Sequence, residues 1–476
     1  MDIFPMLDNK ANEPLYTQLY QYIKIEIQTG KIPPFKKLPS IRHLANDLHL
    51  SKTTIQQAYQ QLLAEGYIES KERSGFYVVD IDKELLGHVF QSHSPPISEK
   101  RPQIKQQHIF YDFYMSNVDA DHFPYLQWRR AMNQSINSDQ KELLSYGHNQ
   151  GEYSLRLEIS NYLRQSRAVN CTAEQIIIGA GTQTLLTFLC YLIRSDHKSV
   201  AMEEPGYEGT RIVFQQLGLQ IEPIQLQNDG INVKDLENSK AKAVYITPSH
   251  QYPLGMVMPI TKRMKLLQWA QKNNGLIIED DYDSEFRYNG KPVPSLQGLD
   301  VYGNVVYIGT FSKSLMPSIR ISYMVLPTRL LQLYRDRLHT YTQTVSRLHQ
   351  NTLQNFIKSG EWERHIRRMR KVYKKKHDTL IHTINNVMKG HVKITGQGAG
   401  LHIVIKVNST ITVDKLVQIA KDKGVSVYST EKYWYYKNIE KDEKIILLGF
   451  GGLTIEEIKK GIARLNQAWL PFYSQN

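Results

Sequence analysis

The stretch YIGTFSKSLMPSIRISYMVLP, residues 307–327, places Lys313 between two serines at the end of an apolar, strand-like run. An ammonium group is costly to bury, so its position there needs a chemical explanation. A lysine that is desolvated at a strand end has a lowered pKa and can form a Schiff base with an aldehyde. Taken alone, a lysine at a strand end is more often a surface residue whose charged end reaches solvent. Pyridoxal 5'-phosphate (PLP), a ring cofactor with an aldehyde and a phosphate, would explain Lys313 if the chain also provides a carboxylate for the ring nitrogen, donors for the phosphate and a flat partner for the ring.

Other residues match the remaining needs of PLP. Asp280, which ends the run LIIED, is placed to hold a carboxylate against the pyridine nitrogen, and Tyr207 in EEPGY could stack on the ring. The turn GAGTQ precedes a helical segment and offers backbone N–H groups at a helix N-terminus, where phosphates bind. Hydroxyl and guanidinium groups close to Lys313 add further donors. The predicted phosphate ligands are Gly181, Thr182, Gln183, Thr310, Ser312 and Arg320.

From about residue 110, short apolar runs alternate with longer helical ones. QIIIGA precedes GTQTLLTFLCYLIRS, for example, and AVYITPSH precedes TKRMKLLQWAQKN. Such alternation predicts an α/β fold with a mostly parallel sheet, whose ligands bind at the carboxyl ends of the strands. The candidate residues fall at those ends.

The chain order of phosphate turn, stacking aromatic residue, carboxylate, lysine and arginine resembles that of the fold type I aminotransferases over residues 110–470. The resemblance implies a large PLP domain, a smaller C-terminal α+β domain, and a homodimer with cofactor sites near the subunit interface. It also implies that Tyr282 hydrogen-bonds the ring hydroxyl and that Tyr146, in YGHNQG, reaches the phosphate of the neighbouring subunit. The chain departs from the family at TPSHQYPLG, residues 247–255, where an Asn-Pro-x-Gly-like turn is usual. Three residues could replace the missing asparagine, and the sequence does not choose between them: Ser249, His250 and Tyr252.

Residues 13–80 are predicted to form a separate compact unit. Three helical segments, EPLYTQLYQYIKIEIQTGKI, LPSIRHLANDLHL and SKTTIQQAYQQLLAEGY, precede YIESKERSGFYVV, which alternates around a turn as a β-hairpin does. Ser40 and Ser51 are the predicted N-caps of the second and third helices. The third helix is expected to bury Ile55, Tyr59, Leu62 and Leu63. Three helices followed by a hairpin predict a winged helix-turn-helix.

Polar side chains on the first turns of the third helix lie opposite its apolar stripe, where they could contact base edges and phosphates in a major groove. The second helix and the tip of the hairpin would reach the DNA backbone or the adjacent groove. The predicted DNA-binding residues are Ser40, Arg42, Ser51, Lys52, Thr53, Thr54, Gln56, Arg73 and Ser74. The alternative is that these residues form an ordinary solvated surface. Net charge does not distinguish the two interpretations, because residues 1–80 hold nine Lys and Arg against nine Asp and Glu. The stretch KLPSIRHLANDLHLSKTTIQQAYQQLLAEGYIESKERSGFYV resembles the GntR-type winged helix, which favours DNA.

Residues 81–109 are polar, contain three prolines and are predicted to be a flexible linker. A GntR-type winged helix joined to an aminotransferase-like domain is the layout of the MocR/GabR regulators. The chain resembles these regulators from end to end, in MEEPGY, TPSHQYPLG and IIEDDYDSEF among other stretches. The resemblance implies a PLP-binding transcription factor that forms a head-to-tail dimer. Ligand chemistry at the PLP would then change how two winged helices engage spaced half-sites of an operator.

The effector is less well defined by the sequence. Aminotransferases hold the substrate carboxylate with an arginine in a C-terminal strand, and in the matching strand KIILLGFGG the approximate place is taken by Leu447. Lys432, in TEKYWYYKN, could substitute from a loop, although we favour a solvated residue. The missing arginine favours PLP itself, or an effector without a carboxylate, over a simple amino acid. A PLP-sensing regulator of vitamin B6 synthesis is one family option that fits, beside control of amino-acid or amine metabolism.

The sequence is also compatible with two other classes of protein. A working PLP-dependent aminotransferase with an auxiliary DNA-binding domain is the main alternative, because nothing around Lys313 excludes catalysis. A PLP-free scaffold is disfavoured, because Asp280, Lys313 and Arg320 are all present.

The basic run RHIRRMRKVYKKKH, residues 364–377, would spread cations around most of a helix and leave a narrow apolar stripe of Ile366, Met369 and Tyr373. We interpret it as a solvated face, and a second contact to DNA phosphates is the alternative.

Composition sets broad limits. The 476 residues suggest more than one domain, and the net charge of +13 suits a polyanionic partner. Cys171 and Cys190 give neither a metal-binding spacing nor a disulfide framework, so we predict no metal site and a reducing, cytoplasmic environment. No apolar run is long enough to span a bilayer, and no membrane partner is expected.

Overall fold

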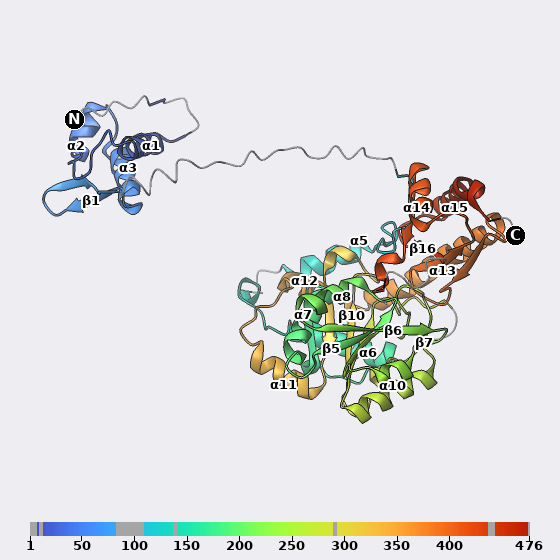
Figure 1. Ribbon diagram of the computed structural model, residues 1–476. Coiled ribbons are helices and arrows are strands. Elements are labelled where there is room, and N and C mark those ends of the chain that lie inside the picture. The colour runs from blue at the N-terminus through green and yellow to red at the C-terminus, as the bar shows by residue number, and fades with distance from the viewer. Residues whose placement is uncertain are drawn as a thin grey trace. The chain divides into compact units, whose positions relative to one another are not determined.

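The computed structural model describes residues 7–8, 13–81, 109–136, 141–288, 293–436 and 443–474. The chain divides into two compact units, residues 1–105 and 106–476 (Figure 1). Apart from its two end residues, the predicted linker lies outside the described residues. In the described part of the chain, no helix is both long enough and apolar enough to cross a membrane.

The N-terminal unit has three helices and a hairpin, as predicted. Its elements are α1 (Leu15–Gln28), α2 (Ile41–Asp47), α3 (Lys52–Ala64) and the antiparallel strands β1 (Ile68–Lys71) and β2 (Gly75–Val78). The Oγ atom of Ser40 accepts from the N–H of His43 at 3.2 Å, and that of Ser51 accepts from the N–H of Thr54 at 3.1 Å. Both predicted N-caps are therefore confirmed.

The core of this unit follows the predicted apolar stripe of α3 with one correction. Ile55, Tyr59 and Leu62 are fully buried, whereas Leu63 is 40% exposed. Successive helical residues point about 100° apart, so Leu63 faces solvent when Leu62 faces the core.

The larger unit contains an eight-stranded sheet with the order β4-β11-β10-β9-β8-β5-β6-β7. Strands β10, β9, β8, β5 and β6 run parallel to one another, while β11 is antiparallel to both of its neighbours and β7 is antiparallel to β6. The prediction of a mostly parallel sheet is confirmed. The strands are β4 (Ile176–Gly179), β5 (Ser199–Glu204), β6 (Gln220–Gln227), β7 (Gly230–Ile231), β8 (Ala243–Ile246), β9 (Leu276–Asp281), β10 (Val305–Thr310) and β11 (Ser322–Val325).

Helices cover both faces of this sheet (Figure 1). Alternate residues of one strand therefore enter different cores: Ile177 packs in the cluster with α7, α8 and α11, whereas Ile176 and Ile178 pack with α5, α6 and α12. Burial on both faces explains why these strands read as continuous apolar runs. The helices are α5 (Tyr125–Ser135), α6 (Tyr153–Arg167), α7 (Thr182–Ile193), α8 (Glu208–Gln216), α9 (Val233–Asn238), α10 (Ile260–Asn273), α11 (Thr328–Arg337) and α12 (Arg347–Lys358).

A smaller α+β part follows at the C-terminus, as predicted. Its antiparallel sheet has the order β12-β13-β16-β15 and its own apolar core. The strand β3 (Tyr111–Asp112), which comes early in the chain, pairs with β14 and so joins this part. The elements are α13 (Glu361–Val387), β12 (Val392–Thr395), β13 (His402–Val407), α14 (Val413–Asp422), β14 (Val425–Ser426), β15 (Tyr428–Ser429), β16 (Lys444–Gly449) and α15 (Ile455–Trp469). Short 3-10 helices occur at Lys141–Leu144, Ala173–Gln175, Gln297–Leu299, Pro317–Ile319, Glu431–Tyr433 and Leu470–Phe472.

The pairing of β3 matters for the site because it fixes the segment that follows it. This segment passes so close to the end of β16 that a Cβ on Gly449 would lie 2.3 Å from the Cα of Met115. Only glycine leaves room for that approach. The contact holds residues 114–116 against the carboxyl ends of the large sheet, where they line the cavity described next.

Candidate functional site

A cavity of about 440 Å³ lies at the carboxyl ends of the central strands, between the large sheet and the smaller C-terminal part. Its volume falls in the range of small-molecule sites. Nine of the predicted cofactor residues line it: Thr182, Gln183, Tyr207, Asp280, Tyr282, Thr310, Ser312, Lys313 and Arg320. Of the other two, Gly181 precedes α7 directly, and Tyr146 is 93% exposed and is not part of the cavity wall.

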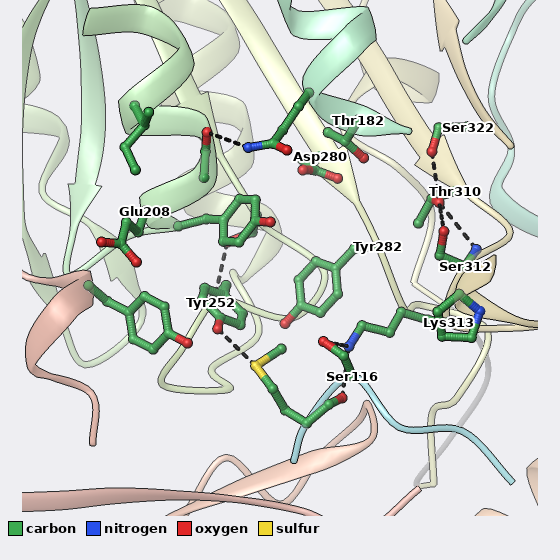
Figure 2. Close-up of a pocket in the computed structure, with 18 of the residues that line it drawn as sticks. Ser116, Thr182, Glu208, Tyr252, Asp280, Tyr282, Thr310, Ser312, Lys313 and Ser322 are labelled. Atoms are coloured by element: carbon green, nitrogen blue, oxygen red, sulfur yellow. Dashed lines mark hydrogen bonds between the residues drawn. The ribbon is translucent and has the colours of Figure 1, made fainter. Parts of the chain in front are cut away.

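The Lys313 side chain extends into this space from the turn after β10 (Figure 2). Its Nζ atom donates to the carbonyl oxygen of Met115 at 2.7 Å and lies 3.4 Å from the Oγ atom of Ser116. Burial lowers the pKa of Lys313 from its ordinary value to about 8, and the nearby Asp283 carboxylate opposes part of that shift. Roughly a tenth of the amine is therefore neutral, and nucleophilic, at pH 7, far more than for an ordinary lysine.

Asp280 and Asp281 are neighbours on β9 and point to opposite faces of the sheet, as strand geometry requires. Asp281 is paired inside the protein: its Oδ2 atom lies 2.8 Å from Nε of Arg167 and accepts from the hydroxyl of Tyr307 at 2.6 Å. Asp280 faces the cavity, where its Oδ2 atom accepts a hydrogen bond from the hydroxyl of Tyr245.

The Oδ1 atom of Asp280 is buried without a hydrogen-bond partner among the described residues. Burial also raises the pKa of Asp280 to about 7, because an unpaired buried carboxylate is disfavoured. A cationic N–H group in the cavity would satisfy this oxygen. The protonated pyridine nitrogen of PLP is such a group, so the residues present fit PLP at this point.

The other end of the cavity offers donors for a phosphate. Helix α7 begins after Gly181, whose φ of +98° favours glycine, and the N–H groups of its first turn have no partners within the helix. The Arg320 guanidinium lies directly over this turn and donates to the carbonyl oxygen of Ala180 at 3.3 Å. A Cβ on Gly181 would come within 2.0 Å of that guanidinium. The helix terminus and Arg320 together form an anion-binding cradle.

Hydroxyl groups complete this end of the cavity. The hydroxyl of Thr310 lies 3.1 Å from that of Ser312 and 2.8 Å from that of Ser322, which links β10 to β11 (Figure 2). Hydroxyl groups can both donate and accept, so this chain of hydroxyls can adjust to an anion.

Aromatic residues form the wall opposite Lys313. The rings of Tyr207 and Tyr252 meet edge to face at 5.4 Å between centroids, and Tyr252 meets Tyr433 in the same way at 4.9 Å. Of the three residues that could replace the family asparagine, only Tyr252 is among those lining the cavity, within the described part of the chain. His250 lies behind Tyr282, and Ser249 is occupied by a hydrogen bond from Arg167 at 2.6 Å.

Several cavity residues were missed by sequence reasoning. Tyr245 precedes the end of β8 by one residue, and strand alternation could have placed it beside Asp280. The others come from segments that only the tertiary structure brings here, and no local pattern marks them. The missed residues include Tyr114, Met115, Ser116, Tyr245, Thr247, Ser322 and Tyr433.

The approximate place of the carboxylate-binding arginine is apolar. Leu447 is fully buried and packs with Tyr252 and Tyr433. Lys432 lines the cavity while its side chain stays exposed, with Nζ 5.1 Å from the centre of the Tyr433 ring. The solvated interpretation of Lys432 is therefore incomplete, because the residue stands at the rim of the site.

The loop that carries Lys432 is fastened to the large sheet. One oxygen of Glu204 accepts from the backbone N–H groups of Tyr435 and Tyr436 at 2.6 and 3.0 Å. Arg211 donates to the carbonyl oxygen of Lys432 at 2.9 Å. The smaller C-terminal part thus closes one side of the cavity through specific polar contacts.

In the N-terminal unit, most predicted DNA-binding residues are on the surface. Three of the predicted hydroxyls are used locally: the Ser51 and Thr54 hydroxyls lie 2.8 Å apart, and the Ser74 hydroxyl lies 2.7 Å from that of Tyr77. Arg73 stands at the tip of the hairpin with a positive φ of 58°. The exposed members of the predicted set are Ser40, Arg42, Ser51, Lys52, Thr53, Gln56 and Arg73.

The basic run on α13 contains both buried and exposed side chains, and two of its arginines hold neighbouring segments. Ile366, Met369 and Tyr373 are buried, as the predicted stripe requires. Lys376 is buried and ion-paired with Asp119. Arg368 and Arg370 hold neighbouring segments by donating to the carbonyl oxygens of His122 and Glu285, at 2.9 and 3.0 Å. The exposed cations of the run are Arg364, Arg367, Arg368, Lys371, Lys374 and Lys375.

Two family models match the chain, one for each unit. Residues 15–78 match the gntR family of bacterial regulatory proteins. Residues 115–464 match the class I and II aminotransferases.

Curated relatives match over nearly the whole length. The chain is 43% identical to the uncharacterized HTH-type transcriptional regulator YdeL of Bacillus subtilis, over 98% of this chain and 100% of that protein. It is 30% identical to the probable rhizopine catabolism regulatory protein MocR of Rhizobium meliloti, over 98% of this chain and 96% of the relative. It is 28% identical to the pyridoxine biosynthesis transcriptional regulator PdxR of Corynebacterium glutamicum, over 95% of both.

Among solved structures, a kynurenine aminotransferase from Pyrococcus horikoshii matches with a TM-score of 0.68 and 25% identity. The match covers 81% of this chain and 99% of that enzyme, whose structure was determined with PMP. The fold type I aminotransferase architecture of the larger unit is thereby confirmed.

Proposed function

The chain belongs to the HTH-type transcriptional regulators that join a gntR-family domain to an aminotransferase class I and II domain, as MocR and PdxR do, and we propose that it regulates transcription in response to PLP. In this proposal the N-terminal unit binds an operator, and the cavity of the larger unit binds PLP. A change in the ligand state of the cavity alters how the protein engages DNA.

One observation carries the cofactor part of the proposal: an unpartnered, buried Asp280 oxygen shares a cavity with the lysine Lys313, whose pKa is lowered to about 8. Asp280 would hold the ring nitrogen, Lys313 the aldehyde carbon, and Arg320 with the start of α7 the phosphate. When bound, PLP would supply an aldehyde that condenses with primary amines. The protein's own contribution is to hold the ring, exclude water and keep part of the Lys313 amine neutral.

The effector is proposed to be PLP itself, or an amine without a carboxylate. Leu447 provides no charge for a carboxylate, and Arg320 is assigned to the phosphate. Lys432 is the remaining cation among the described lining residues, and its exposed position at the rim makes it a poor anchor for a buried carboxylate. The name of the relative PdxR, a regulator of pyridoxine biosynthesis, is consistent with a PLP-level sensor.

A homodimer is part of the proposal. Tyr146 is 93% exposed and lies away from the cavity of its own chain. An exposed tyrosine in this position is available to the phosphate end of a second subunit.

The decisive experiment measures binding of the full-length protein to the DNA upstream of its own gene, with and without PLP. We expect PLP to change the affinity or the footprint of the wild type. The Lys313→Ala variant should bind DNA as the PLP-free wild type does, and it should not respond to PLP. Lys432→Gln is the matched control, since it removes a lysine from the rim of the same cavity and should leave the response intact.

A panel of amines and amino acids then separates the remaining possibilities. If PLP binds without effect and one amino compound produces the change, the protein senses that compound through PLP. If Lys313→Ala responds normally to PLP, the sensor model is wrong. Transfer of amino groups at a useful rate by the wild type would favour the aminotransferase alternative.

A further inference from the structure

A buried polar cluster contacts the hydroxyl of the cavity residue Tyr282, and its members are not among the described residues that line the cavity. It consists of His250, Asp283 and His402, which are 1%, 2% and 2% exposed. The Nδ1 atom of His250 lies 2.9 and 3.1 Å from the two carboxylate oxygens of Asp283. The same Nδ1 atom lies 3.0 Å from the hydroxyl oxygen of Tyr282. One imidazole nitrogen is thus shared between a carboxylate and a residue of the cavity.

The direction of these hydrogen bonds follows from the chemistry of the groups. An ionised carboxylate can only accept, so the Nδ1 atom of His250 must carry the proton that faces Asp283. Turning the ring over would place a carbon atom against the carboxylate. Because Nδ1 is a donor, the Tyr282 hydroxyl cannot donate to it, and its oxygen can only accept a share of the same N–H. The Tyr282 hydrogen is then directed away from His250 and into the cavity.

We propose that Asp283 and His250 are positioning residues that fix Tyr282 as a hydrogen-bond donor toward the ligand in the cavity. The inference rests on the proposed PLP site, whose ring oxygen is the acceptor that such a donor suits. Other titratable groups also face Tyr282, and none of them sets the direction of its hydroxyl hydrogen. They are Tyr245, Tyr252 and Asp280, together with Lys313, which interacts with Asp283.

The C-terminal part of the unit completes the arrangement. His402, at the start of β13, brings its ring to 4.9 Å from that of His250 and lies with Nε2 3.1 Å from the carbonyl oxygen of Pro253. Burial, reinforced by His250, lowers the pKa of His402 to about 3, so this ring stays neutral and adds no competing charge. Nε2 of His402 must donate to that carbonyl, since a carbonyl oxygen only accepts.

Gly400, also in the C-terminal part, packs directly against His250 and Asp283. A Cβ there would lie 2.2 Å from Cε1 of His250 and 2.3 Å from Oδ2 of Asp283, and the φ of +76° itself favours glycine. Its backbone is held by a 2.6 Å hydrogen bond from the hydroxyl of Tyr288. The segment 400–402 therefore keeps water from the Asp283 carboxylate, which leaves His250 as its hydrogen-bonding partner. The direction in which the Tyr282 hydroxyl donates consequently depends on contact between the large-sheet part and the C-terminal part of the larger unit.

The test uses full-length protein loaded with PLP and follows the pH midpoint of its visible absorbance band. A donor to the ring oxygen stabilises the deprotonated form of the bound cofactor, so its loss raises the midpoint. Asp283→Asn allows the amide to donate to His250 and turns Tyr282 away from the ligand. We expect this variant and Tyr282→Phe each to raise the midpoint by about one pH unit, the size expected for a hydrogen bond to a charged group.

The sign of the shift separates positioning from simple electrostatics. Loss of the Asp283 negative charge alone would destabilise nearby positive charge and lower the midpoint. In the Tyr282→Phe background, Asp283→Asn should therefore give no further rise. Tyr373→Phe is the control, because it removes a buried hydroxyl that accepts from the N–H of Asp119 at 3.0 Å, outside the cavity and the cluster, and it should leave the midpoint unchanged.

Each outcome decides between named possibilities. A wild type without a visible band after incubation with PLP overturns the proposed function and the inference together. A normal band with an unchanged or lowered midpoint in Asp283→Asn overturns the inference alone. Retention of stoichiometric zinc that is lost with His402→Ala would also overturn it, since the cluster would then be a metal site. Nitrogen-15 spectra of histidine-labelled wild type need no variant: the Nδ1–H form of His250 is expected, and the Nε2–H form refutes the proposal.

Discussion

Asp280→Asn should stabilise the PLP-free protein while weakening its hold on PLP. In the PLP-free state the carboxylate is buried, and one oxygen lacks a partner among the described residues. Burial raises the pKa of Asp280 from 3.8 to about 7. A shift of about three pH units corresponds to roughly 4 kcal/mol of unfavourable free energy for the charged form. The asparagine keeps an acceptor for the Tyr245 hydroxyl and carries no charge.

The pH dependence of this effect has a definite sign. The pKa of Asp280 is higher in the folded than in the unfolded chain, so the folded state binds more protons between pH values of about 4 and 7. The wild type therefore loses stability as the pH rises through that window, and the loss is complete above it. We expect the variant to unfold at a higher temperature than the wild type at pH 8, with a smaller difference at pH 5.

Calorimetry of the PLP-free proteins at both pH values is the assay. Asp281→Asn is the matched control, since Asp281 is buried on the same strand but ion-paired with Arg167. Breaking that pair should destabilise the protein by about 3–5 kcal/mol. Titration with PLP should show a roughly 10- to 100-fold weaker affinity for Asp280→Asn, the loss expected for a charge-assisted hydrogen bond. A lower unfolding temperature for Asp280→Asn at pH 8, or an equal gain at both pH values, would refute the reasoning.

Three further predictions concern the lysine, the DNA-binding surface and the basic helix. The rate of covalent PLP attachment should rise with pH with a midpoint near 8, because the neutral Lys313 amine is the nucleophile. Stopped-flow absorbance measures this rate, and a midpoint above 10 would contradict the prediction. Arg42→Ala should weaken operator binding and reduce its salt dependence by about one ion without changing the absorbance of bound PLP, as titrations at several salt concentrations would reveal. Replacing Lys371, Lys374 and Lys375 together with glutamine should leave the salt dependence of DNA binding unchanged, and a clearly flatter dependence would assign α13 to DNA.

Features that depend on residues close together in the chain can be predicted from the sequence. Asp280 ends the run LIIED, and strand alternation directs it into the cavity while Asp281 turns to Arg167. The N-caps Ser40 and Ser51 were also readable, because capping depends on residues only three positions apart. Leu63 was misplaced because an apolar residue at the edge of a helical stripe can face either way.

Local patterns established the order of strands and helices, the polar residues at strand ends, and the capped helices of the N-terminal unit. They could not choose between Ser249, His250 and Tyr252, because the packing of the turn decides which of the three lines the cavity, and among the described residues only Tyr252 does so. Nor could they bring Met115 to Lys313, a contact that depends on pairing between β3 and β14, more than three hundred residues apart in the chain. Periodicity and capping act over a few residues, whereas the walls of a cavity are made where distant segments pack, and only folding brings those segments together.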